Sequence, residues 1–78
     1  QMCIRDSIYI VARDRQGLLK DVSEVFMREK QNITGLNTVN VKGDAHMRIS
    51  IEIRSSEDLR RSLSQLRELK GVMSVRRA

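Results

Sequence analysis

Apolar and polar side chains alternate over the first part of the chain and then change to a helical period. From Ile8, every second position is apolar as far as Ala12, which predicts a β-strand that ends at Asp14. The spacing then becomes i, i+3, i+4, i+7, which predicts an amphipathic helix over roughly 17–30. Its buried face comprises Leu18, Leu19, Val22, Val25 and Phe26. Asn32 is expected where the chain leaves this helix, because asparagine tolerates the turn conformations of such an exit.

Two further strands are predicted in the middle of the chain. Residues 33–41 are rich in β-branched side chains, and Gly35 among them indicates either a bulge or a close backbone approach. The run Lys42-Gly43-Asp44 is typical of a hairpin turn. Residues 45–53 then form the clearest strand, because every second side chain from Ala45 to Ile53 is apolar and those between are polar.

A second helix and a short strand are predicted at the end of the chain. Ser55 is a typical N-cap, and the acidic residues that follow it suit the first helical turn. An apolar stripe continues to a helix end at Lys70-Gly71, and it comprises Leu59, Leu63, Leu66 and Leu69. Residues 72–76 are expected to form the last strand.

The order βαββαβ predicts an α+β fold, a ferredoxin-like sandwich. Right-handed crossovers place both helices on one face of a four-stranded antiparallel sheet, with the first and third strands in the centre. The other face of the sheet is polar and suits a subunit or domain contact. It is expected to carry Tyr9, Val11, His46, Arg48, Ser50 and Glu52.

The size of the chain indicates one domain and a partner. A chain of 78 residues buries only about 60% of its unfolded surface, so we expect a homodimer or a contact with another domain of the same polypeptide. Apolar residues make up 40% and charged residues 32%, which is typical of a globular domain. No apolar run approaches the ~20 residues of a membrane span and no signal peptide is evident, so we expect a cytoplasmic protein without membrane contact.

The formal net charge of +5 leaves two interpretations open. The basic residues near the C-terminus form either a solvated face or a surface that contacts RNA or another acidic surface, since a positive patch attracts phosphate regardless of base sequence. Base-specific recognition is not expected, because Tyr9 and Phe26 are the only aromatic residues.

The first seven residues resemble a foreign leader. Met2 to Ser7 matches the translation of a sequencing-adapter end, so we expect residues 1–7 to be non-native and the domain to comprise residues 8–78. The single cysteine, Cys3, cannot form an internal disulfide, and only the distant His46 is available as a second metal ligand. We therefore expect only a structural or incidental role for Cys3.

The junction between the first strand and the first helix is the strongest candidate binding site. The amides of Gly17, Leu18 and Leu19 lack intrahelical partners and can bind a carboxylate, while Asp14 can accept hydrogen bonds from an ammonium group. This pair of features suits a free amino acid. Alternatively, Asp14 caps the helix and Gly17 only allows the chain to turn. Asn32 lies at the other end of the helix, and in an oligomer it would face the Asp14 junction of a partner.

No group of residues indicates catalysis. His46 is the only histidine and lies on a polar strand face, the serines lack the neighbours of a triad, and Glu57 and Asp58 suit the first turn of a helix. We expect no cofactor, no metal and no catalytic residue.

Three segments resemble the ACT domain family. They are Ile10 to Leu19, Lys30 to Ile33 and Val72 to Arg77, and they are most similar to the C-terminal ACT domain of RelA/SpoT-type guanosine tetraphosphate and pentaphosphate synthetase/hydrolases. The resemblance implies a non-catalytic regulatory domain of such an enzyme, which senses a small amino acid, branched-chain ones first, or an assembly state. It assigns ligand binding to Asp14, Gly17, Leu18, Leu19, Asn32 and Ile33. Two positions differ from the family pattern, since Gln16 stands where many members have proline and Ala12 where some have a polar residue.

The alternative is an interaction module without a small-molecule ligand, which docks on RNA or on protein. In a parent protein of this family, the RNA would be ribosomal and the contacts would come from Arg60, Arg61, Arg67, Arg76 and Arg77. A freestanding enzyme has no residues to support it.

Overall fold

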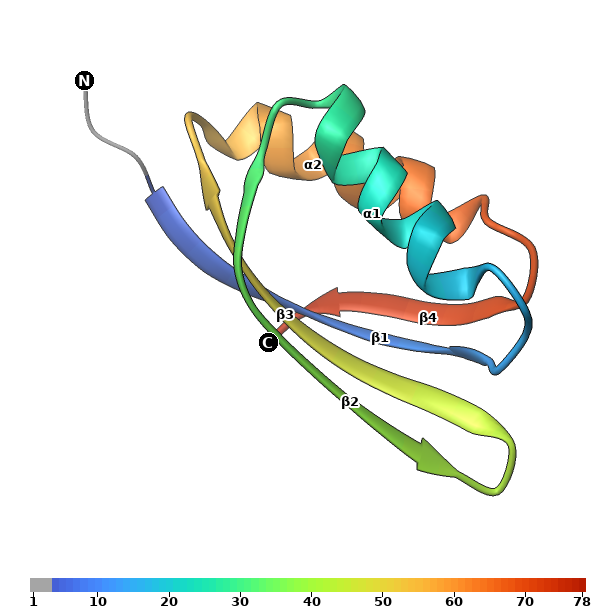
Figure 1. The fold of residues 1–78 in the computed structure, drawn as a ribbon. Helices are drawn as coiled ribbons and strands as arrows, with labels where there is room; N and C mark the ends of the chain where they lie inside the picture. Colours follow the sequence, from blue (N-terminus) through green and yellow to red (C-terminus); the bar gives the residue numbers. More distant parts are fainter. Residues whose placement is uncertain (1–3) are drawn as a thin grey trace.

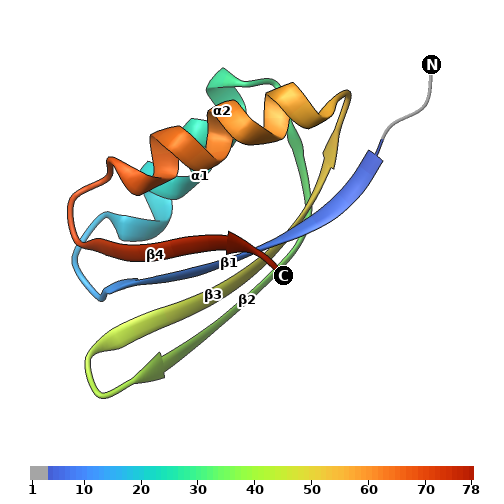
Figure 2. The same cartoon turned by 180° about the vertical axis from the view of Figure 1, so that it is seen from behind.

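The computed structural model describes residues 4–78 and has the predicted element order. The elements are β1 (Ile4–Arg13), α1 (Leu18–Arg28), β2 (Asn32–Val41), β3 (Asp44–Ile53), α2 (Ser56–Arg67) and β4 (Val72–Arg77). The four strands form one antiparallel sheet in the order β2-β3-β1-β4, and both helices cover one of its faces (Figures 1 and 2). The ferredoxin-like prediction is confirmed, including the central position of β1 and β3.

The core lies between the helices and the inner face of the two central strands. Alternation on β1 and β3 points their apolar side chains inward, and the stripes on the helices meet them. Phe26 of α1 and Leu66 of α2 are fully buried there. The other buried apolar side chains are Ile8, Ile10, Ala12, Leu18, Val22, Val25, Ala45, Met47, Ile49, Ile51, Ile53, Leu59 and Val75.

The first strand begins four residues earlier than expected, at Ile4. Sequence alternation becomes weak before Ile8 because Asp6 occupies an inward position, but β3 is long enough to pair with this segment, from Ile4 opposite Ile53 onward. The carboxylate of Asp6 lies 2.7 Å from Nη2 of Arg77 on β4, which gives the inward charge an ionic partner. That residues 1–7 are non-native stays a prediction about their origin, and the expectation for Cys3 lies outside the described residues.

The end of α1 corrects one prediction. The helix ends at Arg28, and the reversal is made by Lys30, whose φ is 56°, rather than by Asn32, which is already the first residue of β2. The amide of Lys30 donates to the carbonyl of Met27 and that of Gln31 to the carbonyl of Phe26. This pair of bonds is a Schellman motif, which a non-glycine residue can also close.

The end of α2 lies three residues earlier than expected, at Arg67. After Arg67 the chain forms hydrogen bonds of the 3₁₀ type. The amide of Glu68 donates to the carbonyl of Gln65, and the amide of Leu69 donates to the carbonyl of Leu66. Gly71 has a positive φ of 89°, but it starts the approach to β4 and does not cap the helix. Two further local predictions are confirmed: Ser55 Oγ accepts from the amide of Asp58, and the register of β2 shifts at Gly35. The prediction that Leu19 belongs to the buried face of α1 is wrong: it lies at the edge of the apolar stripe and is 50% exposed.

The hairpin between β2 and β3 has a two-residue turn. Lys42 and Gly43 both have positive φ, 51° and 85°, which defines the type I′ turn that matches the twist of paired strands. This hairpin extends past the helices, next to the β1–α1 and α2–β4 connections (Figure 1). The three loops therefore lie at the same end of the sheet.

The two helices are joined by polar side chains. Ser62 is fully buried and its hydroxyl donates to Oε1 of Gln31 at 2.6 Å, while Nε2 of Gln31 donates to the carbonyl of Asp58. Closer to the surface, Glu29 accepts from Arg61 and from Gln65 at 3.0 and 2.6 Å. These contacts set how α1 lies against α2.

Glu29 gives a pH-dependent prediction. The hydrogen bond from Arg61, followed by that from Gln65, holds the pKa of Glu29 below its ordinary value of 4.5. Above pH 4.5, the ionised Glu29 carboxylate therefore stabilises the folded state. This stabilisation is lost as the pH falls through the lowered pKa. In urea unfolding from pH 7 down to pH 3, Glu29→Gln should be less stable than the wild type at pH 7, and the difference should shrink on acidification. An unchanged difference would contradict the assignment.

Candidate functional site

The predicted junction turns sharply between β1 and α1. Gly17 is the N-cap of α1 with a φ of 82°, a left-handed conformation that favours glycine. The amide of Leu18 donates to the carbonyl of Arg15 at 3.2 Å, so one of the three amides expected to be free is occupied. Among the described residues, no hydrogen bond reaches the amides of Gly17 and Leu19. Two donors remain for an anionic group.

Asp14 does not cap the helix. No side chain in the described part of the chain caps α1; instead, Oδ2 of Asp14 accepts from Nδ2 of Asn40 at 2.5 Å, and the Asp14 amide donates to the carbonyl of Gly43. Asn40 Oδ1 in turn accepts from the Gly43 amide at 3.2 Å. The carboxylate therefore joins the junction to the β2–β3 hairpin, and within residues 4–78 its other oxygen, Oδ1, has no hydrogen-bond partner.

Arg15 joins the same junction to the α2–β4 connection. Its Nε donates to the carbonyl of Lys70 at 2.8 Å, and its Nη2 lies 2.6 Å from a carboxylate oxygen of Asp21 on α1. In addition, the backbone amide of Arg13 donates a hydrogen bond to the carbonyl of Gly71. Because its guanidinium already has these partners, Arg15 positions the loop and is not a free cation for a ligand. The sequence pattern did not indicate this role.

A pocket of about 310 Å³ opens at this junction, between the start of α1 and the inner side of β2 and β3. Four predicted residues line it: Asp14, Gly17, Leu18 and Leu19. Sequence reasoning missed the remaining lining residues, which are Arg15, Lys20, Thr38, Ala45 and Met47. Those from β2 and β3 reach the pocket only through strand pairing, so no local motif could identify them.

Asn32 and Ile33 lie away from this pocket. They begin β2 at the opposite end of the sheet, beside the C-terminal end of α1 (Figure 1). Nδ2 of Asn32 donates to Glu52 at 3.2 Å, and Ile33 is partly buried against the core. Within one chain, the structure therefore brings four of the six predicted ligand residues together and separates the other two.

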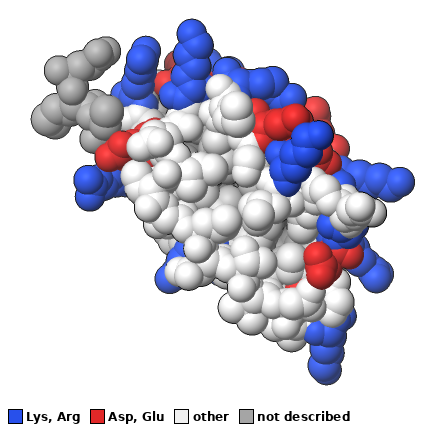
Figure 3. Space-filling view, viewed as in Figure 1, with Lys and Arg blue, Asp and Glu red and all other residues white. Residues whose placement is uncertain are grey.

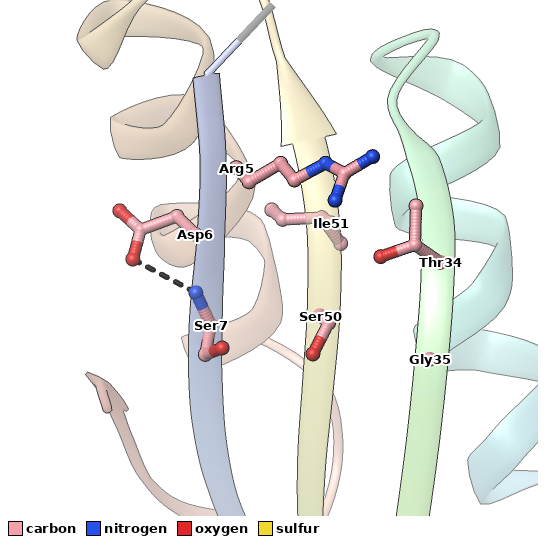
Figure 4. Close-up of a pocket in the computed structure, with 7 residues that line it drawn as sticks. All are labelled: Arg5, Asp6, Ser7, Thr34, Gly35, Ser50 and Ile51. Carbon is pink, nitrogen blue, oxygen red and sulfur yellow. Dashed lines mark hydrogen bonds between the residues drawn. The ribbon is translucent and has the colours of Figure 1, made fainter.

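A second hollow, of about 410 Å³, lies between the N-terminal half of β1 and the start of β2. A row of small residues lies across the sheet at this hollow (Figure 4). It consists of Ser7 on β1, Ser50 on β3 and Gly35 on β2, which are in register. Arg5 extends over this hollow, but its Nε is held by Glu52 at 3.3 Å. None of the six predicted ligand residues lines it.

The five arginines expected to contact RNA do not form one surface. Arg61 pairs with Glu29 and Asp58, Arg77 pairs with Asp6, and Arg76 lies over the ring of Tyr9 on the sheet. Arg67 donates to the carbonyl of Val75. Arg60 on α2 is exposed and has no ionic partner within residues 4–78.

Comparison with known families decides the assignment. The family model described as ACT domain matches residues 6–77. The chain belongs to the ACT domain family. Membership in this family makes it a regulatory rather than a catalytic domain. Neither helix of residues 4–78 has the length and apolar character that crossing a membrane requires.

Two curated relatives place this ACT domain near RelA/SpoT-type enzymes. It is 31% identical over 70 residues to the guanosine-3′,5′-bis(diphosphate) 3′-pyrophosphohydrolase of Aquifex aeolicus, covering 90% of the chain. It is 34% identical over 73 residues to the GTP pyrophosphokinase of Haemophilus influenzae, covering 91% of the chain. The chain spans only 10% of the length of either relative.

Solved structures agree on the fold. The ACT domain of the GTP pyrophosphokinase of Chlorobium tepidum superimposes with a TM-score of 0.87 at 22% identity, covering 99% of this chain and all of that one. The small subunit of acetolactate synthase from Thermotoga maritima gives a TM-score of 0.80 at 16% identity, over 95% of this chain and 47% of that one. The ACT architecture is thus maintained although few side chains are shared.

Proposed function

We propose that this ACT domain regulates a (p)ppGpp synthetase/hydrolase of the RelA/SpoT type by binding a small amino acid at the β1–α1 junction. The observation that carries the proposal is the pocket of about 310 Å³ that joins two unpaired helix amides to the Asp14 carboxylate. Its volume is at the small end of the range for ligand pockets. It therefore suits a metabolite of amino-acid size.

The lining of the pocket supports a zwitterion with an aliphatic side chain. The amides of Gly17 and Leu19 lie at the positive end of α1 and suit the ligand carboxylate, while the second oxygen of Asp14 suits the ammonium group. Leu19, which is 50% exposed, supplies accessible apolar surface next to the buried Leu18, Ala45 and Met47. We therefore propose branched-chain amino acids as the first ligands to test.

A second copy would complete this site. Asn32 and Ile33 begin β2 and the junction lies near its other end, so two β2 edges paired antiparallel about a twofold axis would bring Asn32 of one copy toward the junction of the other. The strand has no charged residue, and Leu36 is 41% exposed on it. In Figure 3, the side of the molecule that carries β2 is mostly uncharged, with Lys and Arg around its rim. We therefore propose a homodimer through β2, which would also allow the domain to report an assembly state.

Titration calorimetry of the 78-residue chain with free amino acids tests the ligand, beginning with valine, leucine and isoleucine. Heats that saturate at millimolar concentration or below would support the proposal. No binding of any amino acid in this range would reject it.

RNA contact is the second candidate function, favoured by the net charge of +5 and by the exposed Arg60. Binding to a structured RNA should weaken with salt, and Arg60→Glu should lower the slope of log K against log salt by about one. Arg61 is unsuitable for this test because it holds Glu29. Lys42→Glu, at the tip of the β2–β3 hairpin, is the matched charge reversal. Equal effects of both variants, or no effect of either, would remove this candidate.

A further inference from the structure

The outer face of the sheet, on the side away from the helices, carries Arg48 and Arg76 side by side with Tyr9, and neither has an acidic partner within residues 4–78. Strand pairing sets Tyr9 of β1 opposite Arg48 of β3 and Arg76 of β4. Both arginines are exposed, and neither forms an ion pair within residues 4–78. Their charges are therefore available to a partner. The open face is defined here as Tyr9, Val11, Asn37, Val39, His46, Arg48 and Arg76.

The centre of the open face is held in place by side-chain contacts. The hydroxyl of Tyr9 lies 2.8 Å from Nδ1 of His46, and Cζ of Arg76 lies 4.9 Å from the centroid of the Tyr9 ring. Such a cation–π contact and the hydrogen bond restrict both the ring and one guanidinium. The positive charge is thus presented from an ordered surface.

Apolar side chains lie directly beside these charges. Val39 and Val41 of β2 are 59% and 46% exposed, and with Asn37 they line a hollow of about 420 Å³ next to Tyr9, His46 and Arg48. Val39 and Val11 flank His46 in the strand register. A partner must therefore match both cations and valines.

The rest of the outer face explains why its positive charge is confined to the region of Arg48 and Arg76. Toward the N-terminal end of β1, Arg5 is neutralised by Glu52, and the hollow there has small polar side chains along its floor (Figure 4). A partner can therefore come close to the backbone at that end. At the other end, the outward Arg13 of β1 is opposite the acidic Asp44 of β3 in the register, so the electrostatic attraction is concentrated at Arg48 and Arg76.

We propose that the open face docks a protein segment that carries carboxylates beside apolar side chains. By charge complementarity, the carboxylates of the segment contact Arg48 and Arg76. Its apolar side chains pack against Val39 and Val41. A nucleic acid fits less well, because base stacking needs a free aromatic face and Arg76 lies over the ring of Tyr9. This docking is separate from the amino-acid pocket, which lies on the inner side of the sheet.

The test is an NMR titration of the ¹⁵N-labelled 78-residue chain with a short synthetic peptide of alternating Glu and Leu. We expect saturable shifts at Tyr9, Val39, Arg48 and Arg76. Replacing Glu with Gln in the peptide should weaken binding about tenfold or more, since the attraction is electrostatic. A uridine oligonucleotide of the same length is the competing probe.

Two pairs of variants decide the outcome. Arg48→Glu with Arg76→Glu should weaken peptide binding at least about tenfold, and the milder Arg48→Gln with Arg76→Gln should reduce it in the same direction if the reversal disturbs folding. Arg60→Glu with Lys70→Glu makes the same charge change near α2 and should leave binding unchanged. Equal losses in both pairs, no binding of the peptide, or tighter binding of the oligonucleotide would each overturn the proposal.

Discussion

Replacing Asp14 with alanine should weaken binding of a branched-chain amino acid by about 10- to 100-fold. The carboxylate is the negative group of the pocket, and a hydrogen bond between charged groups contributes about 1.5–3 kcal/mol, where each 1.4 kcal/mol corresponds to a factor of ten. Calorimetry with valine, leucine and isoleucine measures the change directly. The leucine and methionine side chains that line the pocket remain in place, so apolar contacts should be retained.

The control for this variant must separate the lost charge from a loosened hairpin. Asp14 also accepts the hydrogen bond from Asn40, so Asn40→Ala removes that link while it keeps the carboxylate. We expect Asn40→Ala to bind valine within a few-fold of the wild type. An N-acetylated valine, which has no ammonium group, should bind weakly and equally to the wild type and to Asp14→Ala. If Asp14→Ala binds valine as tightly as the wild type does, the assigned role of Asp14 is wrong.

Two lysines on the free edge of β2 should convert the proposed dimer into a monomer. Lysines on an edge strand prevent strand pairing between copies, because they repel each other across a twofold axis and must lose water on association. The variant is Thr34→Lys with Leu36→Lys, since both side chains are exposed. Sedimentation velocity at tens of micromolar should show a dimer for the wild type and a monomer for the variant.

The matched control adds the same two charges at the opposite side of the molecule. Ser64 on α2 and Met73 on β4 are both exposed, and Met73 lies on the other edge strand of the sheet. Ser64→Lys with Met73→Lys should leave the dimer intact. A monomeric wild type would remove the homodimer from the proposal, and loss of the dimer only in this control would move the interface to β4.

The two experiments also test whether assembly and ligand binding are coupled. If Asn32 of a second copy contributes to the pocket, the monomeric β2 variant should bind valine more weakly although its own Asp14 and Gly17 are unchanged. If the pocket functions within one chain, the affinity of the variant should match that of the wild type. A ligand that binds across an interface stabilises the dimer by mass action, so valine should also shift the wild-type association constant.

Sequence patterns were sufficient for the fold because they depend on local periods. The strict alternation from Ala45 to Ile53 and the helical spacing after Gly17 each identify one buried face, and the crossover rules leave few ways to combine them. The turn signal at Gly43 was also correct, since few residues suit its positive φ, and the register shift at Gly35 agrees with the bulge indicated there. Errors in the element bounds occurred at their ends, as at Lys30, where a helix can be closed by several residues, and Leu19 was wrongly expected to be buried.

The candidate site needed more than local sequence. The sequence by itself determined that Asp14, Gly17, Leu18 and Leu19 lie together at a strand-to-helix junction, because they are neighbours in the chain. Only the tertiary structure decided that Asp14 bonds Asn40 rather than the helix, that Arg15 reaches Lys70, and that Ala45 and Met47 complete the pocket. It also separated Asn32 from the junction by the length of β2. These contacts depend on strand register and loop packing between residues far apart in the chain, and the period of a side-chain pattern does not encode them.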